Sequence, residues 1–249
     1  MNTLFVGQEI IHLDSVDSTN NYTSGLARQS VIHEGLVVYA DLQTEGKGQR
    51  HNKWSSESKA NLLCSIFLTP HFLSASEQFL LTQAISLALV NVVESLSHSF
   101  TYIKWPNDIL VGDQKIAGIL VENTLRGSYL GKSIVGIGLN VNQVLFEPEH
   151  KATSLKLLNG KHFPIDHVLK LLCENVEKQY LQLKQTNGLM LKEYSKRLYK
   201  HNQWTPFLIN QKESQLMRIL GVEKSGKLKL ENKRGEINSF DFHQAKLIR

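Results

Sequence analysis

Three short apolar runs constrain the fold of this chain most strongly. Residues 36–42, 61–68 and 101–105 are each five to eight residues long, and turn-forming residues bound each run. Apolar runs of this length, without polar alternation, are typical of strands that are buried on both faces. A chain of 249 residues is long enough to bury such strands in a sizeable core. We therefore expect a buried sheet at the centre of the fold.

Two further segments extend this predicted sheet. Residues 109–122 have the pattern of a β-hairpin that turns at Gly112-Asp113, although the glycine precedes the aspartate there. Residues 134–141 form another apolar run, which contains two glycines. The strand-like residues IIHLD near the N-terminus precede a short segment, NYTSGLA, that is compatible with a helix.

Segments with the apolar spacing of helices lie between or after the predicted strands. Residues 75–97 carry apolar side chains three or four positions apart, and Ser74 followed by Glu77 predicts a capping box at the start of this helix. A second helix is expected over residues 166–184 and a third, with a weaker pattern, over 188–200. Together these patterns predict an α/β (α+β) fold, in which helices flank a mixed sheet.

The sequence changes character after Trp204. Residues 205–249 alternate short apolar and polar pairs and contain three glycines. This pattern predicts a small antiparallel β-barrel or sandwich, which would be marginally stable alone and would pack on the larger part. We therefore expect one domain over residues 1–203 and a second over residues 204–249.

Composition excludes several classes of protein. No stretch approaches the roughly 18 consecutive apolar residues of a membrane span, and the N-terminus has no signal-peptide pattern. Cys64 and Cys173 lie within apolar patterns, which indicates buried free thiols in a reducing, cytoplasmic setting. Ten histidines show no zinc-binding spacing, so no metal site is expected. The net charge of +5 fits an anionic partner or a polyphosphate substrate.

The segment Lys104-Trp105-Pro106-Asn107-Asp108 carries the most chemistry. It is followed by the sequence KIAGIL, which begins at Lys115. Two lysines, a carboxylate, a carboxamide and an indole thus surround one turn, and a glycine follows on the returning strand. This set of groups is suited to holding a phosphate-bearing substrate beside a small polar one.

Two upstream segments extend the candidate site. Ser18, Thr19 and Asn20 stand where a helix would begin, so they are either capping residues or groups that bind a compact polar ligand. The glycine-rich segment GKGQRHNKW, residues 46–54, lies in a long connection from Thr44 to Ala60. Long ordered connections are often lids or binding loops, and its glycines permit a close approach of the backbone to a ligand.

Two other glycine patterns do not indicate nucleotide-binding loops. Gly127 to Ser133 resembles a P-loop but has one residue too few between its glycines, and it leads into a strand. Gly136-Ile137-Gly138 has no third glycine and no helix after it, so it is not a dinucleotide fingerprint.

The chain resembles the biotin–protein ligases over almost its whole length. Their motifs appear in the same order here, as STN, GKGQRHNKW, KWPND with KIAGILVE, and GIGLNVN. KWPND with KIAGIL is highly specific, whereas the other motifs are partly shared with lipoate–protein ligases. The resemblance implies a class II synthetase-like fold with an SH3-like C-terminal domain. The STN motif begins at residue 18, so the chain resembles the short class, which lacks the DNA-binding winged helix.

This resemblance implies an ATP-dependent reaction in two steps. The carboxylate of biotin attacks the α-phosphorus of ATP to give biotinyl-5′-AMP and pyrophosphate. A lysine of a biotin carboxyl carrier domain then attacks the mixed anhydride to form an amide and release AMP. Because the carboxylate is ionised at neutral pH, the first step needs positioning and charge neutralisation. Lys115 is the main candidate for this task, and Lys47 and Arg50 would neutralise phosphates that Mg²⁺ bridges.

Matching motif positions give the remaining assignments. The residues implied to bind biotin are Ser18, Thr19, Asn20, Gln43, Lys47, Gly48, Gln49, Lys115 and Gly118. The residues implied to bind ATP are Lys47, Arg50, Trp54, Lys104, Asn107, Lys115 and Asn140. For Trp105 and Asp108, a structural role as a buried indole and a turn-stabilising carboxylate is as well supported as a role in the site. Arg249 would contact the nucleotide from the C-terminal domain.

The glycine-rich loop departs from the family pattern GRGRxGR. Lys47 and Gln49 replace its first two arginines, and His51 replaces its later glycine. Lys47 keeps the charge without the two-pronged guanidinium, and Gln49 loses the charge. These departures concern how tightly the loop retains the adenylate. We expect the loop, residues 44–60, to be mobile without ligand and to be ordered by biotin or the adenylate.

Two other functions remain open from the sequence. One is a lipoate- or octanoate–protein ligase of the same fold, which needs a long apolar slot. The other is a non-catalytic biotin-sensing module or a nucleic-acid-binding protein, although no DNA-binding motif is present. The expected partners are biotin, ATP and a carboxylase carrier domain, without DNA or membrane. An exposed strand would also let two copies pair as a homodimer.

Overall fold

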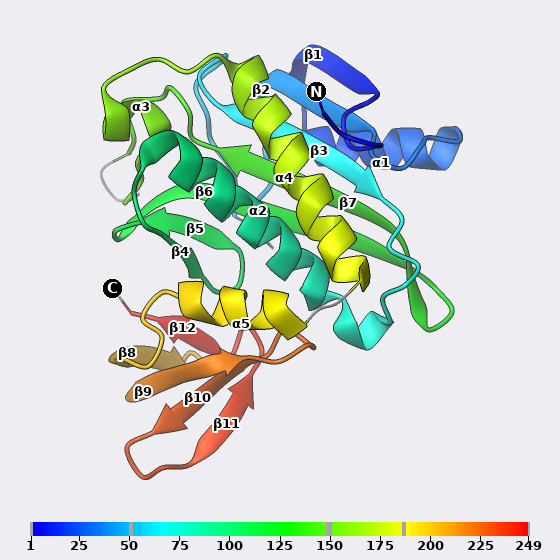
Figure 1. The fold of residues 1–249 in the computed structure, drawn as a ribbon. Coiled ribbons are helices and arrows are strands. Elements are labelled where there is room, and N and C mark those ends of the chain that lie inside the picture. The colour runs from blue at the N-terminus through cyan, green and yellow to red at the C-terminus, as the bar shows by residue number, and fades with distance from the viewer. Residues whose placement is uncertain (1, 50–51, 148–150, 186–187, 249) are drawn as a thin grey trace.

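A seven-stranded mixed sheet forms the centre of the larger part of the protein (Figure 1). The computed structural model describes residues 2–49, 52–147, 151–185 and 188–248. The strands are β1 (Ile10–Val16), β2 (Val37–Gln43), β3 (Leu62–Leu68), β4 (Thr101–Lys104), β5 (Asp108–Val111), β6 (Gln114–Arg126) and β7 (Tyr129–Leu139). Their order across the sheet is β1-β2-β3-β7-β6-β5-β4. Only the β1–β2 pair is parallel.

Helices cover both faces of this sheet. On one face α2 (Phe79–Ser97) and α4 (Ile165–Gln185) lie side by side, and α1 (Thr19–Gln29) packs on the other face against β2, β3 and β7 (Figure 1). Two shorter helices, α3 (Leu155–Asn159) and α5 (Gly188–Arg197), lie near the ends of α2. Every residue of β3 is buried, as expected for a strand at the centre of a sheet covered on both sides.

One helical segment, Ala75–Ser97, is long and apolar enough by composition to cross a membrane, with a mean hydropathy of 1.6. However, 67% of its most apolar 18-residue window is buried inside the protein, where α2 packs against α4 and the sheet. Core helices of globular proteins have the same composition, so packing in the core accounts for the apolar character of this helix.

A separate five-stranded antiparallel sheet follows the helices. Its strands are β8 (Trp204–Ile209), β9 (Glu213–Val222), β10 (Leu228–Asn232), β11 (Ile237–Phe240) and β12 (Ala245–Leu247), in the order β11-β10-β9-β8-β12. Phe207, Ile219 and Leu230 are buried and belong to the main core cluster. This arrangement confirms the predicted α+β architecture with an all-β C-terminal part. The limits 1–203 and 204–249 as independent domains stay a prediction.

Several local expectations were imprecise or wrong. Ser74 does not form the predicted capping box, because its hydroxyl donates to the Glu77 carboxylate instead of capping a backbone N–H. A 3₁₀ turn over Ala75–Glu77 precedes α2 there. The strand predicted at residue 134 already begins at Tyr129, and the helix predicted over 188–200 ends at Arg197. The α3 helix was not predicted at all.

The two cysteines are both free and buried. Burial raises the pKa of the Cys173 thiol to about 12 and also raises that of Cys64 well above its usual value. The reactive thiolate is therefore scarce at pH 8. We expect neither thiol to react with a maleimide at pH 8 in the native protein, and both to react in guanidinium chloride. Labelling of the native protein counted by mass spectrometry tests this, and rapid native labelling would contradict it.

Candidate functional site

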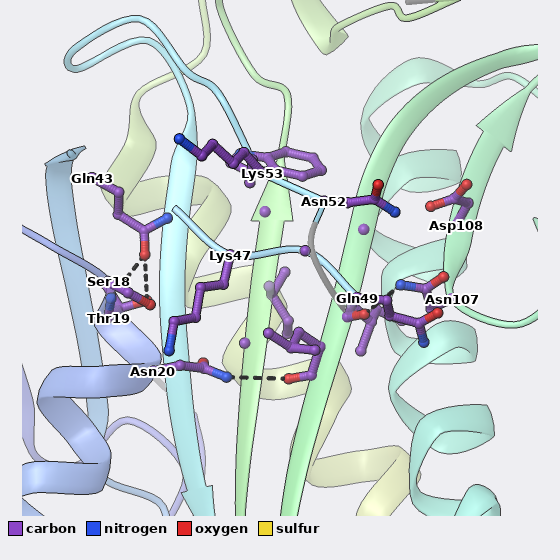
Figure 2. A pocket seen from close by; sticks show the side chains of 18 of the residues that line it. Ser18, Thr19, Asn20, Gln43, Lys47, Gln49, Asn52, Lys53, Asn107 and Asp108 are labelled. Carbon is purple, nitrogen blue, oxygen red and sulfur yellow. Dashed lines mark hydrogen bonds between the residues drawn. The ribbon is translucent and has the colours of Figure 1, made fainter. Parts of the chain in front are cut away.

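A cavity of about 240 Å³ lies on the face of the central sheet that α1 covers (Figure 2). It is enclosed by the start of α1, the end of β2, the glycine-rich loop, the β4–β5 turn and the middle of β6 and β7. The lining residues that carry polar or charged side chains are Ser18, Thr19, Asn20, Gln43, Lys47, Gln49, Asn52, Lys53, Trp54, Cys64, Asn107, Asp108 and Lys115. Segments separated by about a hundred residues therefore meet at one cavity.

Glycines of β6 and β7 form the floor of the cavity. A Cβ atom on Gly138 would lie 2.4 Å from the Trp54 ring, and one on Gly118 would lie 3.0 Å from it. A Cβ atom on Gly136 would lie 2.4 Å from Asn20 Oδ1. At 2.4 Å, a Cβ atom on Gly136 or Gly138 would force Asn20 or Trp54 to move, so the Gly136-Ile137-Gly138 motif serves close packing in mid-strand. The expectation that it is not a dinucleotide fingerprint is confirmed.

Hydrogen bonds between Thr19 and Gln43 fix a polar group, made of these two residues, at one end of the cavity. The backbone N–H of Thr19 donates to Gln43 Oε1 over 2.8 Å, and the Thr19 hydroxyl donates to the same atom over 3.1 Å. Ser18 stands at the N-cap position of α1, but its hydroxyl makes no capping hydrogen bond. The simple capping interpretation of this motif is therefore wrong for Ser18, and its side chain lines the cavity instead.

A buried network below this polar group holds α1 against the sheet. The hydroxyl of Ser65 lies 2.8 Å from Thr19 Oγ1 and 2.6 Å from Asn20 Oδ1. Asn20 in turn donates to Glu122 Oε2 over 2.7 Å. Ser65 is fully buried in an otherwise apolar strand. It satisfies two polar side chains that would otherwise be costly to bury.

The glycine-rich loop folds back on itself over the cavity. The backbone N–H of Trp54 donates to Gly46 O over 2.8 Å, and the backbone N–H of Gly48 donates to Asn52 O over 2.8 Å. A Cβ atom on Gly46 would lie 2.3 Å from Trp54 O, so glycine is required there. The indole Nε1 of Trp54 is buried and has no hydrogen-bond partner within the described part of the chain.

The Lys47 side chain extends from this loop to α1, where its Nζ lies 2.5 Å from Asn21 Oδ1. Asn21 also donates to the Asp17 carboxylate. This hydrogen bond, together with the backbone N–H of Ser18 and the charge of Lys47, lowers the pKa of Asp17. The charge of Lys47 is thus anchored beside the polar end of the cavity (Figure 2).

Lys115 supplies the positive charge at the other end of the cavity, and it shares a carboxylate with Lys104. Lys115 Nζ lies 2.6 Å from Asp108 Oδ1 and 5.2 Å from the centre of the Trp54 ring. The other oxygen of Asp108 lies 3.4 Å from Lys104 Nζ. One carboxylate therefore holds two ammonium groups near each other, which offsets their mutual repulsion. Asn107 supports this turn, because its side-chain amide donates to Ile119 O over 2.8 Å.

A larger cleft of about 650 Å³ adjoins this cavity between the central sheet and the C-terminal sheet. Gln49, Asn52 and Pro106 border both spaces. Lys104 and Trp105 line the cleft from one side, and residues of β8, β10 and β12 line it from the other. The loop and the KWPND turn thus lie between two adjoining compartments.

Most residues assigned from the sequence meet at these two compartments. Ser18, Thr19, Asn20, Gln43, Lys47, Gly48, Gln49, Trp54, Asn107, Lys115 and Gly118 line the cavity. Lys104 lines the cleft instead. Asn140 lines neither space: it is buried, and its side chain donates to Thr153 O over 3.0 Å. Arg50, His51 and Arg249 lie outside the described residues.

Sequence reasoning missed part of the site. Asn52, Lys53, Ile119 and Ile137 line the cavity without having been singled out. Asp108, left undecided between structure and function, pairs with both lysines. Ser65 and Glu122 support the site from behind. One indication of a special role for Ser65 was present in the sequence: it is the only hydroxyl residue in the apolar run LLCSIFL.

One group of potential metal ligands occurs among the described residues, and it lies outside the cavity lining. His12, Asp14 and Asp41 place ligand atoms within 4.8 Å of one another on β1 and β2. His12 Nε2 lies 3.0 Å from Asp41 Oδ1, and Lys59 pairs with the same carboxylate. Exposed groups of this kind are common without a metal, and existing partners account for two of the three side chains.

The geometry suits a small ligand with a neutral polar head and an anionic tail. Hydroxyl and amide groups lie at one end of the cavity, glycines and an indole form its middle, and the Lys115 ammonium lies at the other end. A volume of about 240 Å³ admits a compact molecule. The adjoining cleft, with Lys104 and Lys246 in its walls, suits a larger anionic group.

Residues 13–140 match the sequence model of the biotin/lipoate A/B protein ligase family. Among curated proteins, the chain is 35% identical over 185 residues to the "Bifunctional ligase/repressor BirA" of Bacillus spizizenii, which covers 72% of this chain and 56% of that protein. It is 28% identical over 183 residues to the "Biotin--[acetyl-CoA-carboxylase] ligase" of Mycobacterium tuberculosis, with 72% and 67% covered. The chain thus spans about half the length of the first of these relatives.

Among solved structures, the fold is similar to that of the biotin protein ligase from Aquifex aeolicus in complex with biotin and ATP. The TM-score is 0.79 at 24% identity, and the match covers 97% of this chain and 99% of the other. At this level of identity the likeness establishes the fold, including the separate C-terminal sheet.

Proposed function

Because this chain belongs to the biotin/lipoate A/B protein ligase family, we propose that it activates biotin with ATP and transfers the biotinyl group to a lysine of a carrier protein. The observation that carries this proposal is the placement of Lys115 opposite the Thr19–Gln43 pair in one small cavity. Biotin has a polar ureido ring at one end and a carboxylate at the other, and these match the two ends of the cavity.

Charge neutralisation supports the first step. The biotin carboxylate and the α-phosphate of ATP repel each other, and the Lys115 ammonium at the cavity wall would contact both as they meet. Asp108 holds Lys115 in place beforehand, so little ordering is left for the moment of reaction. The nucleotide enters as its Mg²⁺ complex, with its phosphates toward the lysines of the loop and of the KWPND turn.

The second step needs access for another protein. The lysine of the carrier attacks the carbonyl of the mixed anhydride, and AMP leaves. A biotin carboxyl carrier domain is the acceptor that we propose. We place the reaction in the cytoplasm, where ATP is present and free thiols such as Cys64 and Cys173 stay reduced. The edge strand β1 offers a sheet edge that a homodimer of the expected kind would use.

Biotin-dependent exchange of radiolabelled pyrophosphate into ATP tests the proposed first step, with lipoate and octanoate as alternative acids. We expect exchange with biotin alone. Exchange with lipoate or octanoate instead would agree with the proposed reaction type, but it would show that biotin is not the substrate. The absence of exchange with every acid, in a protein that still binds biotin, would favour a biotin-sensing module.

Ligands should protect the glycine-rich loop against proteolysis. Lys47 and Lys53 are trypsin sites on the two arms of this loop, and a bound adenylate would contact both arms and oppose local opening. We expect biotin with ATP to slow cleavage at these sites about tenfold or more, as followed by mass spectrometry. The exposed Lys151, outside the loop, serves as an internal control. Equal cleavage rates with and without ligands would contradict this prediction.

A further inference from the structure

The Trp105 side chain connects the two sheets. It lines the cleft between them, and its indole Nε1 donates a hydrogen bond to Gly226 O over 2.8 Å. Trp105 belongs to the β4–β5 turn of the central sheet, whereas Gly226 belongs to the β9–β10 turn of the C-terminal sheet. These residues are separated by 121 positions in the sequence.

Two further contacts seat the β9–β10 turn, residues 223–227, on the start of α2 and on the 3₁₀ turn before it. A Cβ atom on Gly226 would lie 2.9 Å from ring atoms of Phe79, and the backbone there has a φ of +96°, so glycine is required on both grounds. Lys224 Nζ lies 3.0 Å from Glu77 Oε1. This hydrogen bond and that from Ser74 lower the pKa of Glu77.

The C-terminal sheet has a second attachment at the chain connection before β8. Tyr199 N–H donates to Ile103 O over 2.8 Å, and Asn202 N–H donates to Ile219 O over 3.0 Å. A small domain that is held only at its connecting segment is free to swing about it. Buried side chains of the C-terminal sheet also belong to the main core cluster, and the seated β9–β10 turn adds a further contact that fixes the orientation of the sheet.

The orientation of the C-terminal sheet determines the spacing across the cleft. Lys104 lies on the wall that the central sheet contributes, and Lys246 lies on the opposite wall. Cations on facing walls suit a polyphosphate that bridges them, but only at a defined separation. Since Trp105 follows Lys104 directly, one short segment both contributes a cation to the cleft and fixes the opposite wall.

We propose that Trp105 is a positioning residue, which sets the spacing of the cleft for the polyphosphate of ATP through its hydrogen bond to Gly226. This inference rests on the proposed function. It assigns Trp105 no contact with the reacting atoms, and it predicts a selective effect on the nucleotide. Among the described residues, none of the C-terminal sheet lines the small cavity that we assign to biotin, so biotin binding should be insensitive to this contact.

Two variants test the proposal. Trp105→Phe keeps an aromatic ring and removes the donor, and Gly226→Ala displaces the turn from Phe79. We expect the KM for ATP to rise about fivefold in Trp105→Phe, the factor that one net hydrogen bond commonly supports, and at least as much in Gly226→Ala. The Kd for biotin and kcat should stay within about twofold. Lys227→Ala is the matched control, because its side chain in the same turn lies 3.7 Å from Asp241 within the C-terminal part.

An unchanged KM for ATP in both variants would overturn the proposal. So would an equal rise in Lys227→Ala, or a parallel loss of biotin binding. Amide hydrogen exchange over residues 223–227 provides a readout that is independent of activity, and we expect faster exchange in Trp105→Phe than in the unmodified protein. If the unmodified protein shows no biotin-dependent exchange of pyrophosphate, the proposed function fails. Unchanged amide exchange, by contrast, would overturn the positioning role itself.

Discussion

Replacing Lys115 with alanine is expected to lower biotin-dependent pyrophosphate exchange by about 10²–10³, the usual cost of removing one preorganised donor from a charged transition state. The Lys115 ammonium lies 2.6 Å from Asp108 and is only one-third exposed, at 33%. Water therefore replaces it poorly once the cavity is filled. Initial exchange rates at saturating biotin and ATP give the measurement.

A matched control is available nearby. The backbone N–H of Lys115 donates to Lys151 O, and the Lys151 side chain points to solvent, 3.5 Å from Asp113. Lys151→Ala removes the same charge close to the site, and we expect a change of less than about twofold because exposed ion pairs contribute little. If Lys115→Ala keeps more than a tenth of the exchange rate, the role assigned to Lys115 is wrong.

Replacing Glu177 with alanine is expected to cause the largest loss of stability. The Glu177 carboxylate, 6% exposed on α4, accepts hydrogen bonds from the backbone N–H groups of Leu4, Phe5 and Val6 at 2.7, 2.7 and 3.0 Å. Without this carboxylate, either the three N–H donors are left unpaired or the N-terminal segment detaches from α4 and exposes Val6. We expect a loss of about 3 kcal/mol in the free energy of unfolding. For a chain of this size that corresponds to about 6–12 °C in Tm.

Glu174→Ala provides the comparison for this variant. Glu174 lies on the same helix and accepts one exposed hydrogen bond, from Asn2 N–H at 3.0 Å. Its removal should cost less than about 0.5 kcal/mol. Thermal unfolding followed by circular dichroism compares the two variants, and proteolysis near the N-terminus should be faster only in Glu177→Ala. Equal Tm values for Glu177→Ala and Glu174→Ala would contradict the anchoring role.

The central strands and long helices were predictable because their signals are local. The run LLCSIFL is buried at every position, as its composition indicated. The helix expected over 166–184 was found one residue longer at each end. The capping box at Ser74 failed because the Ser74 hydroxyl donates to the Glu77 carboxylate, which also pairs with Lys224, a residue 147 positions away that no local pattern involves.

The candidate site was only partly predictable, since its roles depend on distant partners. Motif spacing selected Lys115 and Gln43, and both line the cavity. Asn140 follows the same kind of motif, yet it is buried and bonded to Thr153. Gly138 was set aside as part of a false nucleotide motif, and the structure places Trp54 against it.

By itself, the sequence determined the elements, the fold class and the residue types that the chemistry needs, because periodicity and short motifs act over a few neighbouring positions. Only the tertiary structure decided that Asp108 joins Lys104 to Lys115, that Ser65 supports Thr19 and Asn20, and that Trp105 contacts Gly226. Such contacts depend on how the strands are ordered and how the second sheet docks. That order is set by the packing of the whole core and is not encoded in any single segment.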